Sequence, residues 1–102
     1  MYNNKPMCLI TAILPISTTM PIIRELHAMG IYTANKSTAR GSSNTSKIHD
    51  VEMEIMTVLI EEEQSEDIFG LIYERGGLFQ PSHGLIYQTS ISICSEYFLP
   101  DK

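Results

Sequence analysis

With 102 residues, 43% of them hydrophobic, the chain is long enough for one globular domain and too short for two. Its formal net charge of −5 and the lack of any basic run argue against binding to nucleic acid or to an anionic membrane surface. No apolar run is long enough to cross a bilayer. Cys8 and Cys94 lack CxxC spacing, so we expect two buried free thiols in a reducing cytoplasm rather than a redox or metal pair.

The first third of the chain predicts a strand, a helix and a second strand. Residues 7–14 are almost continuously apolar and end at Pro15, which is typical of a central strand buried on both faces. Hydroxyl residues 17–19 followed by Pro21 predict the start of a helix of about 10 residues. This helix ends near Met29 at Gly30, with its apolar face formed by Ile22, Ile23, Leu26 and Met29. A weaker strand is expected over residues 31–39.

The remainder predicts a loop, a long strand, a helix and a last strand. Residues 41–46 are polar and flexible, and residues 51–60 form a strand that is solvated at its start and buried at its end. The run Glu61-Glu62-Glu63 is expected to be a solvated turn. Ser65 is expected to cap a helix whose apolar face is Ile68, Phe69, Leu71 and Ile72, and Gly76-Gly77 ends it. Residues 85–94 form the last strand, followed by a short polar tail over 95–102.

The order β-α-β-β-α-β predicts an α+β, ferredoxin-like fold: a four-stranded antiparallel sheet with both helices on one face. We expect a single domain over 1–102 with its core over about 7–94. The helices leave the second face of the sheet uncovered. The first strand and the end of the third are nevertheless apolar on both sides, so another subunit is expected to cover that face.

Several motifs in this order resemble the PII-type (P-II) nitrogen regulatory family over about Cys8 to Ile93. Residues 9–13, Leu-Ile-Thr-Ala-Ile, are similar to the first strand of the family, and residues 28–31 to its helix-to-strand step. The distance from Gly30 to Gly41 fits the family's distance to the glycine that opens its T-loop. Residues 84–87, Gly-Leu-Ile-Tyr, are similar to the start of the family's last strand.

The resemblance implies a homotrimer that binds adenine nucleotides in clefts between subunits. It implies a shortened T-loop over 41–50, which contacts a regulated protein or transporter in the family, and a phosphate-binding B-loop before the last strand. A turn with exposed N–H groups also suits an anion on physical grounds. The implied ligand-binding residues are Asn35, Ser37, Arg40, Gly41, Ser42, Val58, Leu59, Ser82, His83 and Gly84.

The chain departs from the family where phosphates are held. Leu85 stands at the position of the B-loop lysine, and the two C-terminal arginines of the family fall near Glu96 and Phe98. Losing three charge-assisted donors disfavours tight ATP binding. We therefore expect a small anionic metabolite, with ADP or AMP as the adenine nucleotides that fit. Arg40 replaces part of the lost charge or forms a surface ion pair, and His83 is an anion donor or an exposed turn residue.

Three alternatives to this sensor are a metal-binding protein, an assembly module whose sheet face only forms oligomers, and an enzyme. Met1, Met7, Cys8, Met53, Met56, His27 and His83 are soft or borderline ligands that suit copper, and CutA-like trimers of the same topology are linked to divalent metals. Methionine at core spacing more often fills a core, however. No catalytic constellation has recognisable spacing, and the glutamates lack an apolar setting, so we expect no enzyme.

Overall fold

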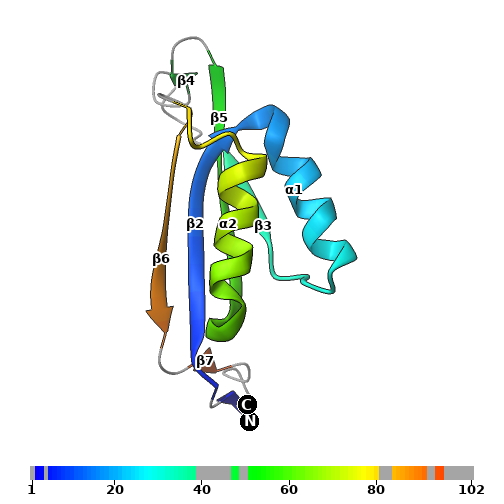
Figure 1. Cartoon of the computed structure of the whole chain (residues 1–102), viewed down its shortest axis with the longest axis vertical. Helices are drawn as coiled ribbons and strands as arrows, with labels where there is room; N and C mark the ends of the chain where they lie inside the picture. The colour runs from blue at the N-terminus through cyan, green and yellow to red at the C-terminus, as the bar shows by residue number, and fades with distance from the viewer. Residues whose placement is uncertain are drawn as a thin grey trace.

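The computed structural model describes residues 2–3, 5–38, 47–48, 51–80, 84–91 and 94–95. Its main sheet has the strand order β3-β5-β2-β6, and every neighbouring pair is antiparallel. These strands are β2 (Met7–Pro15), β3 (Asn35–Thr38), β5 (Val51–Glu61) and β6 (Leu85–Ile91). Helices α1 (Ile16–Ala28) and α2 (Ser65–Arg75) pack on one face (Figure 1). The predicted ferredoxin-like α+β fold is confirmed.

The core lies between the helices and the two central strands. β2 and β5 pair from Met7↔Glu61 to Pro15↔Met53. Because successive strand residues point to opposite faces, every second residue of β2 meets the helices. The fully buried side chains include Cys8, Ile10, Ala12 and Leu14 from β2, Met56 and Val58 from β5, Ile22 and Leu26 from α1, and Ile68 and Ile72 from α2.

Helix α1 begins earlier than the sequence pattern predicts. It starts at Ile16, directly after Pro15, whose φ of −58° already suits a helix. The residues expected to cap it therefore lie inside its first turn, where the Thr18 hydroxyl donates back to the Pro15 carbonyl at 2.8 Å. Pro21 lies in the helix interior rather than in the first turn. The expected burial of Met29 is also wrong, since this side chain is 50% exposed.

Glycine ends both helices in the same way. Gly30, with φ of +87°, follows α1, and the N–H groups of Gly30 and Ile31 donate to the carbonyls of His27 and Leu26 at 2.9 Å. Gly77, with φ of +69°, does the same after α2. These bonds form Schellman motifs, in which a left-handed glycine closes the last turn. The predicted helix ends are therefore confirmed.

The predicted cap of α2 at Ser65 is wrong, because Ser65 is already the first residue of the helix. A 3₁₀ turn, η1 (Glu62–Gln64), precedes it, and neither η1 nor α2 has a side-chain cap hydrogen bond. Glu66 and Asp67 do lie in the first turn of α2, where the partial positive charge of the helix end favours carboxylates.

The strands differ from the prediction in several places. β3 (Asn35–Thr38) begins four residues later than expected, and β6 is described as far as Ile91. Residues 39, 92 and 93 lie outside the described residues. Within the segment expected to be a loop, β4 (Lys47–Ile48) pairs with the start of β5. Residues assigned to the last strand and the tail form β7 (Cys94–Ser95), which pairs with β1 (Tyr2–Asn3) (Figure 1). β1 and β7 are far apart in the sequence, and local pattern does not reveal such a pairing.

The second face of the sheet is apolar and carries no helix among the described elements. Leu9 and Ile13 of β2 lie opposite Leu59 and Ile55 of β5, and all four are partly exposed. Leu85 and Tyr87 of β6 extend this surface and are about half exposed, at 48% and 51%. We call this surface, formed by Leu9, Ile13, Ile55, Leu59, Leu85 and Tyr87, the open face.

Candidate functional site

Four of the ten predicted ligand-binding residues lie together on two neighbouring strands. Asn35 and Ser37 are exposed on β3 and pair with Thr57 and Ile55 of β5. Val58 and Leu59 follow on β5; the Val58 side chain is fully buried, so only its backbone could meet a ligand. The predicted residues Arg40, Gly41, Ser42, Ser82 and His83 lie outside the described residues.

The remaining predicted residue, Gly84, lies at the opposite edge of the sheet. It precedes β6, and three strand spacings, or about 14 Å, separate β6 from β3. Gly84 has φ of +118°, and a Cβ atom there would lie 1.9 Å from the carbonyl oxygen of Ile13. The fold itself therefore requires glycine at this position. A Gly84→Asp substitution would disturb β6 whether or not a ligand binds, so it is unsuited as a binding test.

The backbone of Leu59 is already hydrogen-bonded in this structure. The Thr33 hydroxyl donates to the Leu59 carbonyl oxygen at 2.5 Å and accepts a bond from the Leu59 N–H at 3.2 Å. Leu59 is one of the ligand-binding residues that the family resemblance implies. A ligand that used the backbone of Leu59 would therefore have to displace the hydroxyl of Thr33.

A pocket of about 310 Å³ lies beside this contact, at the lower end of the range for small-molecule sites. Its walls come from the start of β2, the connection between α1 and β3, the end of β5, and η1. The lining residues are Met7, Met29, Gly30, Ile31, Tyr32, Thr33, Leu59, Ile60, Glu61 and Gln64. Of these only Leu59 was a predicted site residue. The others could not be assigned from sequence, because the pocket forms between segments that are more than 20 residues apart in the chain.

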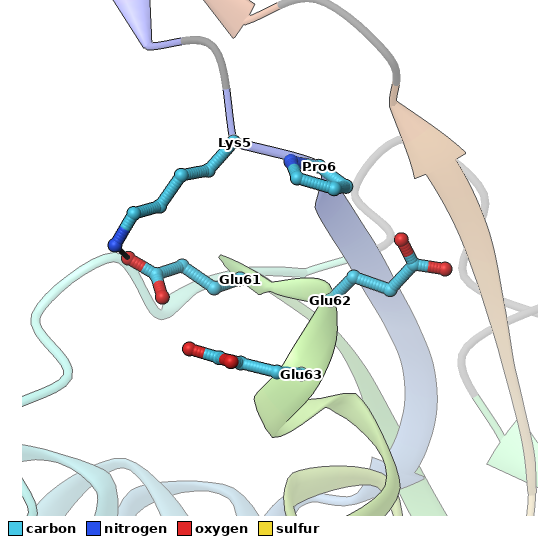
Figure 2. A pocket seen from close by; sticks show the side chains of 5 residues that line it. All are labelled: Lys5, Pro6, Glu61, Glu62 and Glu63. Atoms are coloured by element: carbon cyan, nitrogen blue, oxygen red, sulfur yellow. Dashed lines mark ion pairs between the residues drawn. The ribbon is translucent and has the colours of Figure 1, made fainter.

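A second pocket, of about 520 Å³, adjoins the first through Glu61 and is strongly acidic (Figure 2). Lys5, Pro6, Glu61, Glu62 and Glu63 line it. Lys5 Nζ lies 3.5 Å from Glu61 Oε2, whereas the Glu62 side chain points away from this pair (Figure 2). Three carboxylates around one ammonium group repel anions, so this end of the sheet does not suit a phosphate group.

Lys36, between Asn35 and Ser37 on β3, is held by a buried carboxylate. Its Nζ lies 3.3 Å from Oε2 of Glu54, whose side chain is only 4% exposed. The other oxygen, Oε1, is buried and has no hydrogen-bond partner among the described residues. This ammonium group is therefore committed to Glu54, and its release toward a ligand would leave a buried negative charge uncompensated.

The residues considered as copper ligands do not converge where the structure describes them. Met7, Cys8, Met53 and Met56 are core side chains with exposures of 8% or less, and Cys8 is a free thiol. The exposed ring of His27 instead packs against Tyr32, with centroids 5.3 Å apart. Within the described ranges, no group of three His, Cys, Asp or Glu residues is arranged to hold a metal ion. His83 and Met1 are outside these ranges, as is the side chain of Cys94.

No protein-family model matches the sequence, and no curated protein sequence is detectably similar to it. Solved structures, in contrast, match the fold. A PII protein of Arabidopsis thaliana bound to citrate is 20% identical with a TM-score of 0.66, over 88% of this chain and 78% of that one. The Bacillus subtilis GlnK-ATP complex is 13% identical with a TM-score of 0.65, over 85% and 83%.

A third solved structure, of a PII-like signalling protein from Thermus thermophilus described as putative, is 16% identical with a TM-score of 0.61, over 85% and 87%. The chain therefore has the fold of PII-type proteins over most of its length. Across the described residues, neither helix is long and apolar enough to pass through a bilayer.

Proposed function

We propose that this chain is a cytoplasmic PII-like regulatory protein that senses a small anionic metabolite in clefts between the subunits of a homotrimer. The observation that carries the proposal is the match to PII structures over most of both chains. Two of those structures were determined with citrate and with ATP, which are both small anionic metabolites.

Two features of the fold support a site between subunits. The open face is a broad apolar surface that a lone chain leaves in water, and covering it is the usual reason for a small domain to oligomerise. The predicted ligand-binding residues also fall on opposite edges of one sheet, with Ser37 on β3 and Gly84 before β6. A second copy placed against an edge would bring the two sets together.

The charges near the predicted residues favour a ligand with fewer phosphates than ATP. Lys36 is paired with Glu54, Lys5 is paired with Glu61, and Leu85 takes the place of a lysine. A triphosphate needs several unpaired donors. ADP, AMP or a similar metabolite with fewer negative charges than ATP is the ligand class that this charge distribution suits.

Thermal unfolding with a panel of ligands tests the proposal, together with native mass spectrometry for the number of subunits. The panel contains ATP, ADP, AMP, citrate, Zn²⁺ and Cu(I). A ligand at about 100 times its Kd adds about 2.7 kcal/mol, which raises Tm by several degrees for a domain of this size.

A shift with one nucleotide or carboxylate, together with a trimer mass, supports the sensor. A shift with a metal ion alone would favour the CutA-like alternative. A monomer that responds to no anion would contradict the proposal. For the open face, Leu9→Asp should abolish the trimer, because a carboxylate would be buried at the interface, whereas the exposed-site control Tyr73→Asp should not.

A further inference from the structure

The ladder between β3 and β5 ends before the last residues that its register could pair. The last pair is Asn35↔Thr57, and extending the register by two residues on each strand places Thr33 opposite Leu59. Thr33 is not part of β3, however, and its backbone makes none of the ladder bonds given for this pair of strands. The Thr33 side chain makes the hydrogen bonds instead. Its single hydroxyl donates to the C=O of Leu59 and accepts from the N–H of Leu59.

This arrangement leaves a donor–acceptor pair on β5 accessible at the pocket. Both bonds to Leu59 are exposed to solvent, and Thr33 and Leu59 both line the pocket of about 310 Å³. A complete strand would have sealed this edge with main-chain bonds. The Thr33 hydroxyl covers these groups of Leu59 only reversibly, because one rotation about χ1 of Thr33 removes both hydrogen bonds at once.

The groups around Leu59 suit a flat ring that carries a donor and an acceptor side by side. Such an edge, as in an aminopurine, can donate to the Leu59 carbonyl and accept from the Leu59 N–H. Tyr32, 72% exposed, and Met29, 50% exposed, offer an aromatic ring and a thioether for packing against the ring. Glu61 at the rim disfavours anions there, so the phosphate end of a nucleotide would have to point away.

We propose that the Thr33 hydroxyl competes with the ligand. It occupies the N–H and C=O of Leu59 that an aminopurine ring would use, and it must rotate away before the ring can bind. This inference rests on the proposed function, since it concerns the base-binding part of the same site. The observed affinity is then the intrinsic affinity multiplied by the fraction of molecules in which Thr33 has released Leu59.

The test compares two substitutions at Thr33, one that removes the hydroxyl and one that keeps it. Thr33→Val keeps the branched shape and removes both bonds, whereas Thr33→Ser retains them. Kd for adenosine is measured by calorimetry for the wild type and both variants, with purine riboside, which lacks the amino donor, as the matched ligand. Thr33→Val should bind adenosine about two- to tenfold more tightly, because a net hydrogen bond no longer competes. Thr33→Ser should match the wild type, and purine riboside should bind more weakly than adenosine throughout.

A second measurement follows the competition directly. The amide resonance of Leu59 should shift in Thr33→Val and should return toward its wild-type position when adenosine is saturating, since the ring replaces the hydroxyl. Equal or weaker adenosine binding in Thr33→Val than in the wild type would overturn the inference while leaving the sensor proposal intact. Absence of binding of any nucleoside or nucleotide to all three proteins would overturn this inference, and absence of a response to citrate as well would overturn the sensor proposal.

Discussion

The two faces of β2 differ sharply, although one strand of nine residues forms them both. On the inner face Cys8, Ile10, Ala12 and Leu14 are all fully buried beneath α1 and α2. On the outer face Leu9, Thr11 and Ile13 are only partly buried. The chain covers the first face with its own helices. Residues 9, 11 and 13 include no charged side chain, so the outer face lacks the polar alternation that a sheet facing water normally shows.

The contrast continues into the neighbouring strands. The outer pairs Leu9↔Leu59 and Ile13↔Ile55 are aliphatic, and Thr11 lies opposite Thr57. The corresponding inner positions carry one charged residue, Glu54, opposite Leu14. The face that is covered by helices thus contains a buried carboxylate, while the face without a cover is uncharged at its centre. A second copy on the outer face, as proposed above, would account for this difference.

Truncation of adjacent residues of β2 gives the largest expected effect. Ile10→Ala on the inner face should lower the free energy of unfolding by about 2–5 kcal/mol, because a fully buried side chain leaves a cavity. Leu9→Ala on the outer face should cost less in a monomer, since its side chain is partly exposed already. Urea unfolding at several protein concentrations measures both.

Concentration dependence separates the two substitutions. The cost of Leu9→Ala should grow as the protein concentration rises, because association buries this residue further, whereas the cost of Ile10→Ala should stay nearly constant. Equal costs at every concentration would argue that the outer face remains in water.

Replacement of Glu54 tests the charged position on the inner face. Glu54→Met removes a buried carboxylate and leaves Lys36, whose side chain is 43% exposed, free to reach water. Removing one member of a buried ion pair is costly when the other charge stays buried, but Lys36 can be solvated, so we expect a change between zero and a gain of about 1 kcal/mol. Chemical denaturation of the wild type and the variant measures it.

Replacement of the other member of the ion pair is the matched control. Lys36→Met leaves the Glu54 carboxylate buried without its cation and should cost roughly 1–3 kcal/mol. A loss of more than about 2 kcal/mol in Glu54→Met would mean that this carboxylate has a further stabilising partner.

The smallest expected effect concerns the clamp that joins the two helices over the inner face. Arg75 Nε and Nη2 donate to the two carboxylate oxygens of Glu25 at 3.0 and 3.1 Å. The Arg75 hydrogen bonds lower the pKa of Glu25 below its ordinary value, outweighing desolvation. The stabilisation is therefore present above the unfolded-state pKa of Glu25 and is lost as the pH falls through the lower, folded-state value.

Thermal unfolding of the wild type and Glu25→Gln between pH 7 and pH 2 measures this contribution. The difference in Tm should be small, since both side chains are exposed, and should vanish at the acidic end. It should also shrink in 1 M NaCl, because salt screens exposed pairs. A difference in Tm that is unaffected by pH would show that the clamp acts through packing and not through charge.

Local sequence pattern was sufficient for the element order and for both helix ends. Each of these predictions depends only on residues that are close in the sequence. The signals are the apolar run of β2, the helical spacing of Ile22 and Leu26, and the glycines at 30 and 77. The start of α1 was mispredicted for the same reason, because Pro15, the residue directly before the helix, also ends the strand before it. The separate pairing of β7 with β1 brings together the two ends of the sequence, which no local pattern indicates.

The sequence by itself therefore determined the βαββαβ order and the existence of an apolar second sheet face, since both follow from the periodicity of hydrophobic residues. Only the tertiary structure decided which groups meet. The register between β3 and β5 aligned Thr33 with Leu59, and the approach of Gly84 to the Ile13 carbonyl excluded any side chain there. The physical reason is that register depends on contacts between residues distant in the chain, and a shift of one residue would turn every side chain to the other face.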